Sequence, residues 1–85
     1  MYCSCFSADV PNESPYLIRY FVFEENGRYG IECAQEGPAA GHSIRSVRCP
    51  AVAESLEEAE RIACRLAEGA VRPIHVADVI EDLRS

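Results

Sequence analysis

The sequence predicts a small α+β domain in which a three-stranded antiparallel β-meander is followed by two helices packed on one face of the sheet. A run of aromatic and β-branched residues leads directly into Asn26-Gly27, the strongest short signal for a β-hairpin. Two later segments carry apolar residues at helical spacing. Because 85 residues can bury one small core and not two, we expect the order β-β-β-α-α in a single domain.

The start of the chain is expected to be an irregular arm over residues 1–15, with the domain covering residues 16–85. Residues 7–15 contain two prolines and several polar turn formers, and they lack an apolar period. Folding is therefore expected to begin near Pro15.

The hairpin is expected to join a strand at residues 16–24 to a strand at residues 28–35. A two-residue turn at Asn26-Gly27 would fix the register, with these opposing pairs: Glu25 and Arg28, Phe23 and Gly30, Val22 and Ile31, Tyr20 and Cys33. One face, which carries Ile18, Tyr20, Val22, Tyr29, Ile31 and Cys33, is the expected core face. On the second face, Phe23 is expected to cover the bare backbone of Gly30.

A third strand is expected at residues 43–49, ended by Pro50. Ile44 and Val47 fall on opposite faces of a regular strand, so a β-bulge is expected in this strand.

Two helices are expected to complete the chain. Ser55-Leu56-Glu57-Glu58 is a capping-box pattern, which predicts a helix that starts at Ser55 and stops at Gly69. After Pro73, a second amphipathic helix would bury Val76, Val79, Ile80 and Leu83 and turn Asp78, Glu81 and Asp82 to solvent.

With both helices on one face, the second face of the sheet is left for solvent or a partner. The residues expected at this interface are Leu17, Arg19, Phe21 and Phe23. Homodimerisation is the simplest way to cover such a face. We therefore expect a non-catalytic protein-interaction or regulatory module that forms a homodimer.

Charge and composition exclude several other classes. The net charge of −6 disfavours binding to nucleic acid and to anionic membranes. There is no apolar run long enough to cross a bilayer and no signal-peptide pattern at the start, so we expect a soluble cytoplasmic protein. The five cysteines are an odd number and are expected to be reduced thiols.

The alternative function is metal binding or thiol redox chemistry at Cys3 and Cys5. These thiolates could hold zinc together with Cys49, Cys64, His42 or His75. Strong zinc signals have two to four residues between paired cysteines, whereas one residue separates Cys3 from Cys5, so no cofactor is the primary expectation. His75 is a possible functional residue, as a base for a cysteine nucleophile, but its position before an apolar stripe favours helix capping.

Two segments resemble a family of short Firmicutes proteins grouped as a domain of unknown function. They are Tyr29-Gly30-Ile31 and the tail Pro73-Ile74-His75-Val76-Ala77-Asp78-Val79-Ile80-Glu81-Asp82-Leu83. The resemblance would cover residues 16–85, with Cys3-Ser4-Cys5 outside it. It implies a shared small fold and no catalytic residues.

Overall fold

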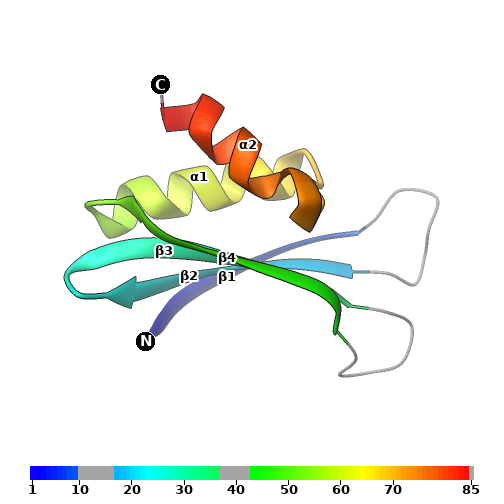
Figure 1. Cartoon of the computed structure of the whole chain (residues 1–85), viewed down its shortest axis with the longest axis horizontal. Coiled ribbons are helices and arrows are strands. Elements are labelled where there is room, and N and C mark those ends of the chain that lie inside the picture. Colours follow the sequence, from blue (N-terminus) through cyan, green and yellow to red (C-terminus); the bar gives the residue numbers. More distant parts are fainter. Residues whose placement is uncertain (10–16, 37–42, 85) are drawn as a thin grey trace.

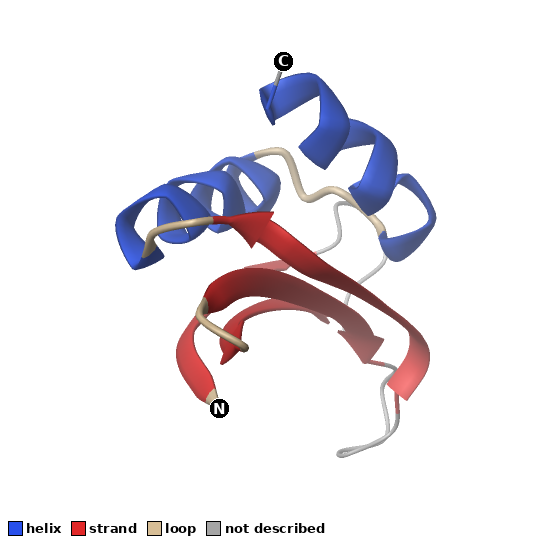
Figure 2. Ribbon diagram, turned by 60° about the vertical axis from the view of Figure 1, so that its left-hand side comes forward, coloured by secondary structure: helices blue, strands red, loops and turns tan. Residues whose placement is uncertain are grey.

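The computed structural model describes residues 1–9, 17–36 and 43–84. Over these ranges the chain forms one four-stranded antiparallel sheet, in the order β1-β2-β3-β4, followed by two helices (Figure 1). The elements are β1 (Tyr2–Asp9), β2 (Leu17–Glu25), β3 (Arg28–Glu36), β4 (Ser43–Ala53), α1 (Leu56–Glu68) and α2 (Pro73–Arg84). Both helices lie on the same side of the sheet, as Figure 2 shows from a second direction. The predicted α+β class is therefore confirmed.

The prediction of three strands was wrong, because β1 adds a fourth strand in a segment that was expected to be irregular. β1 pairs antiparallel with β2, with Phe6 opposite Tyr20 and Ala8 opposite Ile18. Phe6 and Ala8 pack against the core, which supplies the apolar contacts that hold the strand in place. The strand gives a weak signal in the sequence, because Ser4, Phe6 and Ala8 on its helix-facing side include only one large apolar residue and a register shift separates Tyr2 from Ser4.

The hairpin between β2 and β3 has the predicted register. Glu25 lies opposite Arg28 and Phe23 opposite Gly30, and the pairing continues to Leu17 opposite Glu36. Asn26 and Gly27 have φ angles of 54° and 78°, the positive values that a type I′ turn requires at both central positions.

β4 extends beyond its predicted end, because Pro50 lies within a bulge and does not stop the strand. Tyr29 pairs with Ala53 and Ile31 with Cys49, so the strand holds extra residues at this point. Ala51 takes up the bend with a φ of 55°. Proline is tolerated here because β4 is an edge strand. The one bulge that was predicted in this strand is found at its start, since Gln35 pairs with Arg45 and Glu36 with Ser43, which leaves Ile44 as the additional residue.

The predicted ends of α1 are confirmed. The residue in the left-handed conformation that ends the helix is Ala70, however, and not Gly69. The Ser55 hydroxyl accepts a hydrogen bond of 3.2 Å from the Glu58 amide and so caps the helix. At the other end Gly69 has a φ of −91°, and Ala70 takes the left-handed conformation with a φ of 47°. The amides of Ala70 and Val71 donate to the carbonyls of Ala67 and Leu66, both at 3.1 Å, which is a Schellman motif.

The core lies between the helices and the helix-facing side of the sheet. Its buried members include Ile18, Tyr20, Val22, Ile31 and Cys33 from the sheet, Ala59, Ile62, Ala63 and Leu66 from α1, and Val76 and Ile80 from α2. The Tyr20 hydroxyl donates a 2.6 Å hydrogen bond to the carbonyl of Val71, in the connection between the two helices. The Ser4 hydroxyl also donates to the carboxylate of Glu60, which links β1 to α1. These hydrogen bonds join the sheet to α1 and to the connection between the two helices.

None of the described helices has the length and apolar content needed to cross a membrane.

Candidate functional site

The candidate site is the side of the sheet that faces away from the helices, here called the open face. Since side chains alternate along a strand, the pairing register assigns its members. They are Tyr2, Cys5 and Ser7 from β1, Leu17, Arg19, Phe21, Phe23 and Glu25 from β2, Arg28, Gly30, Glu32, Ala34 and Glu36 from β3, and Ser46 and Arg48 from β4. The four interface residues expected from the sequence all lie on this face, in alternate positions of β2.

Three aromatic rings form a cluster at one end of the open face. The ring centroids of Tyr2 and Phe21 lie 5.4 Å apart, and those of Tyr2 and Phe23 lie 6.3 Å apart. Both contacts are edge-to-face, the arrangement that aromatic quadrupoles favour. Tyr2 is 56% exposed, whereas Phe21 is half-buried. The cluster therefore presents part of its aromatic surface to solvent.

Phe23 itself is buried within its own chain, with an exposed fraction of 1%. Its ring occupies the space above Gly30, where a side chain at that position would collide with it. The guanidinium carbon of Arg48 lies 3.8 Å from the centroid of the Phe23 ring, within the range of a cation–π contact. The sequence analysis left Phe23 open to solvent or a partner, whereas β1 and β4 supply the residues that cover it.

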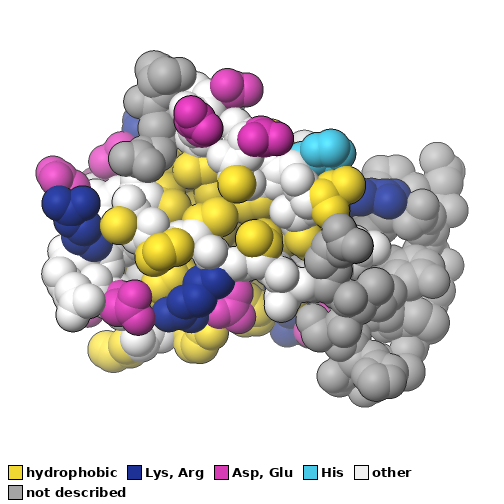
Figure 3. All heavy atoms as spheres, in the orientation of Figure 1, with side chains coloured by type: hydrophobic (Ala, Val, Ile, Leu, Met, Phe, Trp, Pro, Cys, Tyr) yellow, Lys and Arg dark blue, Asp and Glu magenta, His cyan; other side chains and the backbone are white. Residues whose placement is uncertain are grey.

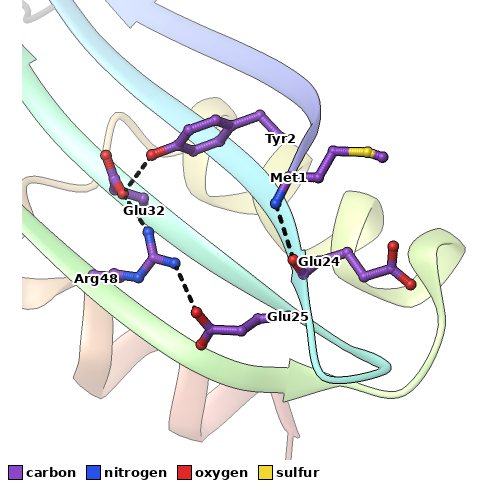
Figure 4. Close-up of polar contacts among 6 residues, drawn as sticks. All are labelled: Met1, Tyr2, Glu24, Glu25, Glu32 and Arg48. Carbon is purple, nitrogen blue, oxygen red and sulfur yellow. Dashed lines mark hydrogen bonds and ion pairs between the residues drawn. The ribbon is translucent and has the colours of Figure 1, made fainter.

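A polar network surrounds the aromatic cluster (Figure 4). The Tyr2 hydroxyl and Nη1 of Arg48 both donate to Oε1 of Glu32, each at 2.9 Å. The second guanidinium nitrogen of Arg48, Nη2, lies 3.4 Å from Oε2 of Glu25. The hydrogen bond to Glu32 raises the pKa of the Tyr2 hydroxyl above its usual value, because it favours the protonated phenol. Arg48 of β4 thus binds two carboxylates, that of Glu32 in the middle of β3 and that of Glu25 at the end of β2.

The start of β1 is held in place by backbone contacts. The amide of Glu24 donates to the carbonyl of Met1 at 2.8 Å, and the terminal ammonium of Met1 donates to the carbonyl of Glu24 at 3.1 Å (Figure 4). These bonds fix the backbone next to Tyr2, which positions its ring against the cluster.

A further ion pair, which does not involve Arg48, lies on the other half of the open face. Nε of Arg19 is 3.3 Å from Oε1 of Glu36, and both side chains are partly exposed. The half-buried Leu17 lies directly opposite Glu36 in the register. The open face therefore combines partly exposed apolar side chains with charges of both signs.

Sequence reasoning missed Tyr2 and Arg48 as members of this site. Tyr2 was assigned to an irregular arm, and the register shift that follows it conceals its strand position. Arg48 lies opposite Glu32, a pairing that depends on the bulge at Ile44 and so could not be read from strand alternation alone.

The predicted metal ligands do not come together among the described residues. Cys3 and Cys5 are both exposed, and their Sγ atoms each lie 3.8 Å from a backbone carbonyl oxygen, of Met1 and Phe6 respectively. No group of three or more histidine, cysteine or acidic side chains that could hold a metal ion occurs in the part of the chain that is described. His42, one of the further ligands considered, lies outside the described residues.

The thiols on the helix-facing side of the sheet are poor nucleophiles. Burial, with a smaller contribution from neighbouring Cys49, raises the pKa of the Cys33 thiol to about 12. Burial also raises the pKa of the Cys49 thiol. Reactive cysteines have lowered pKa values, so both shifts run against a thiolate mechanism.

His75 lies inside the first turn of α2, where its amide donates to the carbonyl of Arg72 at 2.9 Å. Its side chain is exposed, as are those of Asp78, Glu81 and Asp82 on the same helix. The acidic residues therefore form the solvent-facing side that the helical period predicts. A functional or capping role of His75 stays a prediction.

The sequence was also compared with known proteins. A model for a family of unknown function, DUF6514, matches residues 3–85. The chain belongs to this family. The DUF6514 match covers β1 from Cys3 onward, so it takes in most of the N-terminal segment that the resemblance to residues 16–85 had left out. No curated protein and no solved structure matched this DUF6514 member.

Proposed function

We propose that this DUF6514 protein is a non-catalytic interaction module that forms a homodimer through the open face of its sheet. The observation that carries the proposal is the one-sided placement of the helices, which leaves Tyr2, Leu17 and Phe21 partly exposed on the opposite face. Apolar surface of this kind, rimmed by polar residues, marks many protein interfaces.

The residue types on the open face support a protein partner. Tyrosine, phenylalanine and arginine are enriched at interface cores and among the residues that dominate binding energy. Here Tyr2 and Phe21 form the aromatic centre, while Arg19 and Arg48 lie at its sides. Phe23 is buried within the chain, so in a dimer it would support the contact surface and would not itself touch the partner.

The charges on the open face support a second copy of the chain as that partner. The face carries Arg19 and Arg48 together with Glu25, Glu32 and Glu36. In a two-fold interface the same surface appears on both sides, so each arginine of one copy can approach a glutamate of the other. A face with charges of one sign would repel its own copy.

The experiment is to compare the oligomeric state of the parent with that of Phe21→Glu by sedimentation velocity. The new carboxylate would lie at the centre of the dimer contact, and the expected product is a folded monomer. Leu83→Glu is the matched control, because it makes the same kind of change at a residue of α2 that is 39% exposed. It should leave the dimer intact.

A second variant covers the case in which Phe21→Glu fails to fold. Tyr2→Ala removes an exposed ring without adding a charge beside Glu32, and it should weaken the dimer about tenfold or more. A parent that is monomeric, or a folded variant that dimerises as tightly as the parent, would overturn the proposal.

A further inference from the structure

A second surface of interest lies on the helix side of the sheet, between β4 and α2. A groove of about 400 Å³ is lined there by Ser46, Val47, Pro73, Ile74 and Ala77. Figure 3 shows apolar side chains gathered over this region, with acidic side chains above them. Ile74 is 57% exposed, although it is a large aliphatic residue. Of the residues that line it, only Ser46 also belongs to the open face, whereas Val47, Pro73, Ile74 and Ala77 lie on the helix side of the sheet.

The floor of the groove ends at a free strand edge. Among the described residues, β4 is the last strand of the sheet, so no described strand pairs with the backbone groups on its outer side. The hairpin fixes which groups these are. A two-residue turn makes Glu25 and Arg28 a hydrogen-bonded pair, and in an antiparallel ladder the bonding direction then alternates from residue to residue.

Along β3, this alternation directs the backbone N–H and C=O groups of Ile31 and Cys33 towards β4. Their partners Cys49 and Val47 bond back to β3. The intervening residues Ser46 and Arg48 therefore direct their N–H and C=O groups to the free edge. These four backbone groups can pair with an added strand.

An added strand would also place side chains in the groove. Val47 faces the helices, because its partner Cys33 is in the core. A strand that continues the sheet beside β4 would point alternate side chains in the same direction, against Val47 below and Ile74 and Ala77 above. The backbone edge and the apolar groove thus select the same kind of ligand, an extended segment with apolar residues at every second position.

The charge of α2 adds a further requirement. The helix stripe that begins with Ile74 and Ala77 continues one turn later with Asp78 and Glu81. Both carboxylates are exposed. A lysine or arginine in the bound segment would find a complementary charge at this end of the groove.

Pro50 limits how far such a strand can extend. The proline has no N–H, and it lies in the bulge where β4 departs from a regular register. Pairing is therefore restricted to the stretch around Ser46 and Arg48, which fits a short segment and disfavours an open-ended pairing of sheets.

We infer that the groove between β4 and α2 binds a short extended segment of another protein by strand addition. The segment has apolar side chains at alternate positions and a basic residue beside Asp78 and Glu81. This inference goes beyond self-association through the open face, and either can fail without the other.

The test uses randomised linear peptides displayed on phage and selected against the full chain. The selected peptides are expected to share alternating apolar residues and a lysine or arginine. Their affinity is then measured by fluorescence anisotropy with the parent and with Ile74→Glu. The substitution puts a carboxylate into the exposed apolar wall of the groove, and the Kd should rise about tenfold or more.

Two further variants separate the groove from other surfaces. The double variant Asp78→Lys with Glu81→Lys should weaken peptides that carry a basic residue, and more so at low ionic strength. Leu83→Glu is the control, because Leu83 lies on the same helix but lines a different hollow with Arg61, Ile62 and Arg65. It should leave the Kd unchanged.

Three results would overturn the inference. The first is a selection that enriches no sequence beyond those enriched on an unrelated protein. The second is a set of peptides that bind Ile74→Glu as tightly as the parent. The third is a set whose binding is lost in Phe21→Glu and kept in Ile74→Glu, which would assign the peptides to the open face.

Discussion

The ring of Phe23 lies directly over Gly30, in the space that a side chain at position 30 would need. A Cβ atom built on Gly30 would collide with this ring and would also lie 2.6 Å from the carbonyl oxygen of Cys49. The two residues are opposite one another in the hairpin register, so the contact follows from the pairing of β2 with β3. This relationship allows the ring to be buried on a face that no helix covers.

Gly30→Ala is expected to destabilise the protein by about 1–3 kcal/mol, because neither the ring nor the Cys49 backbone can move without cost. The change is measured by urea denaturation. In a Phe23→Leu background, the same substitution should cost less, because the smaller side chain relieves part of the collision.

Gly69→Ala is the control for this prediction. Gly69 has a φ of −91°, and the nearest atom to an added Cβ, Cγ2 of Val71, lies at an ordinary 3.5 Å. Gly69→Ala should therefore change the free energy of unfolding by no more than about 0.5 kcal/mol. Equal effects of the two glycine substitutions would contradict the packing account.

Ala70→Gly is expected to stabilise the protein by about 0.5–1 kcal/mol, because Ala70 has a φ of 47°, which glycine adopts without a steric penalty. The shift in denaturation midpoint measures this gain. Ala67→Gly places the same residue inside α1 and should destabilise by a similar amount. If both substitutions destabilise the protein, the result would contradict a left-handed conformation at Ala70.

Tyr20→Phe is expected to cost about 1–3 kcal/mol, since it removes the donor of the 2.6 Å hydrogen bond to Val71 and leaves that carbonyl unpaired. Tyr29→Phe is the matched control, because the described part of the chain gives the Tyr29 hydroxyl no hydrogen-bond partner. Denaturation curves of the two variants should differ in midpoint. Coincident curves would show that the Tyr20 hydroxyl does not anchor the helix connection.

Stability is expected to fall at alkaline pH because the pKa of the Cys33 thiol is raised in the folded state, from 9.0 to about 12. Above pH 9 the unfolded chain loses this proton while the folded chain keeps it, so the free energy of unfolding decreases as pH rises towards 12. Below pH 9 both states are protonated and the contribution is intact.

The variant Cys33→Ala tests this pH dependence. It removes the titrating group, so its free energy of unfolding should fall less steeply between pH 9 and pH 11 than that of the parent. The cavity lowers its stability at every pH, and for this reason the slope is the quantity to compare. Parallel slopes would contradict burial of the thiol.

Much of the fold could be predicted because local signals agree with the tertiary structure. The Asn26-Gly27 turn fixes the register of β2 and β3, and the Ser55 capping pattern fixes the start of α1. The strand β1 was not predicted, because its helix-facing positions Ser4, Phe6 and Ala8 include only one large apolar side chain and so give a weak alternation. Pro50 was expected to end the last strand, but the strand continues past it because a bulge in an edge strand tolerates a proline that a central strand would not.

The open face was predicted in part. The alternation of Leu17, Arg19, Phe21 and Phe23 along one strand was sufficient to place them together. The burial of Phe23 was not predictable, since it depends on contacts from Tyr2 and Arg48 on strands that pair only in the folded sheet. Such contacts between distant segments leave no periodic signal in the sequence.

Self-association through the open face is tested most directly by native mass spectrometry of the reduced full chain, purified without a chelator. We expect a metal-free dimer for the parent and for Leu83→Glu, and a monomer for Phe21→Glu. A parent that is monomeric at every concentration, or whose dimer persists unchanged in folded Phe21→Glu, would contradict this account. A mass increased by a bound zinc ion would instead favour the thiols of Cys3 and Cys5 as the functional groups.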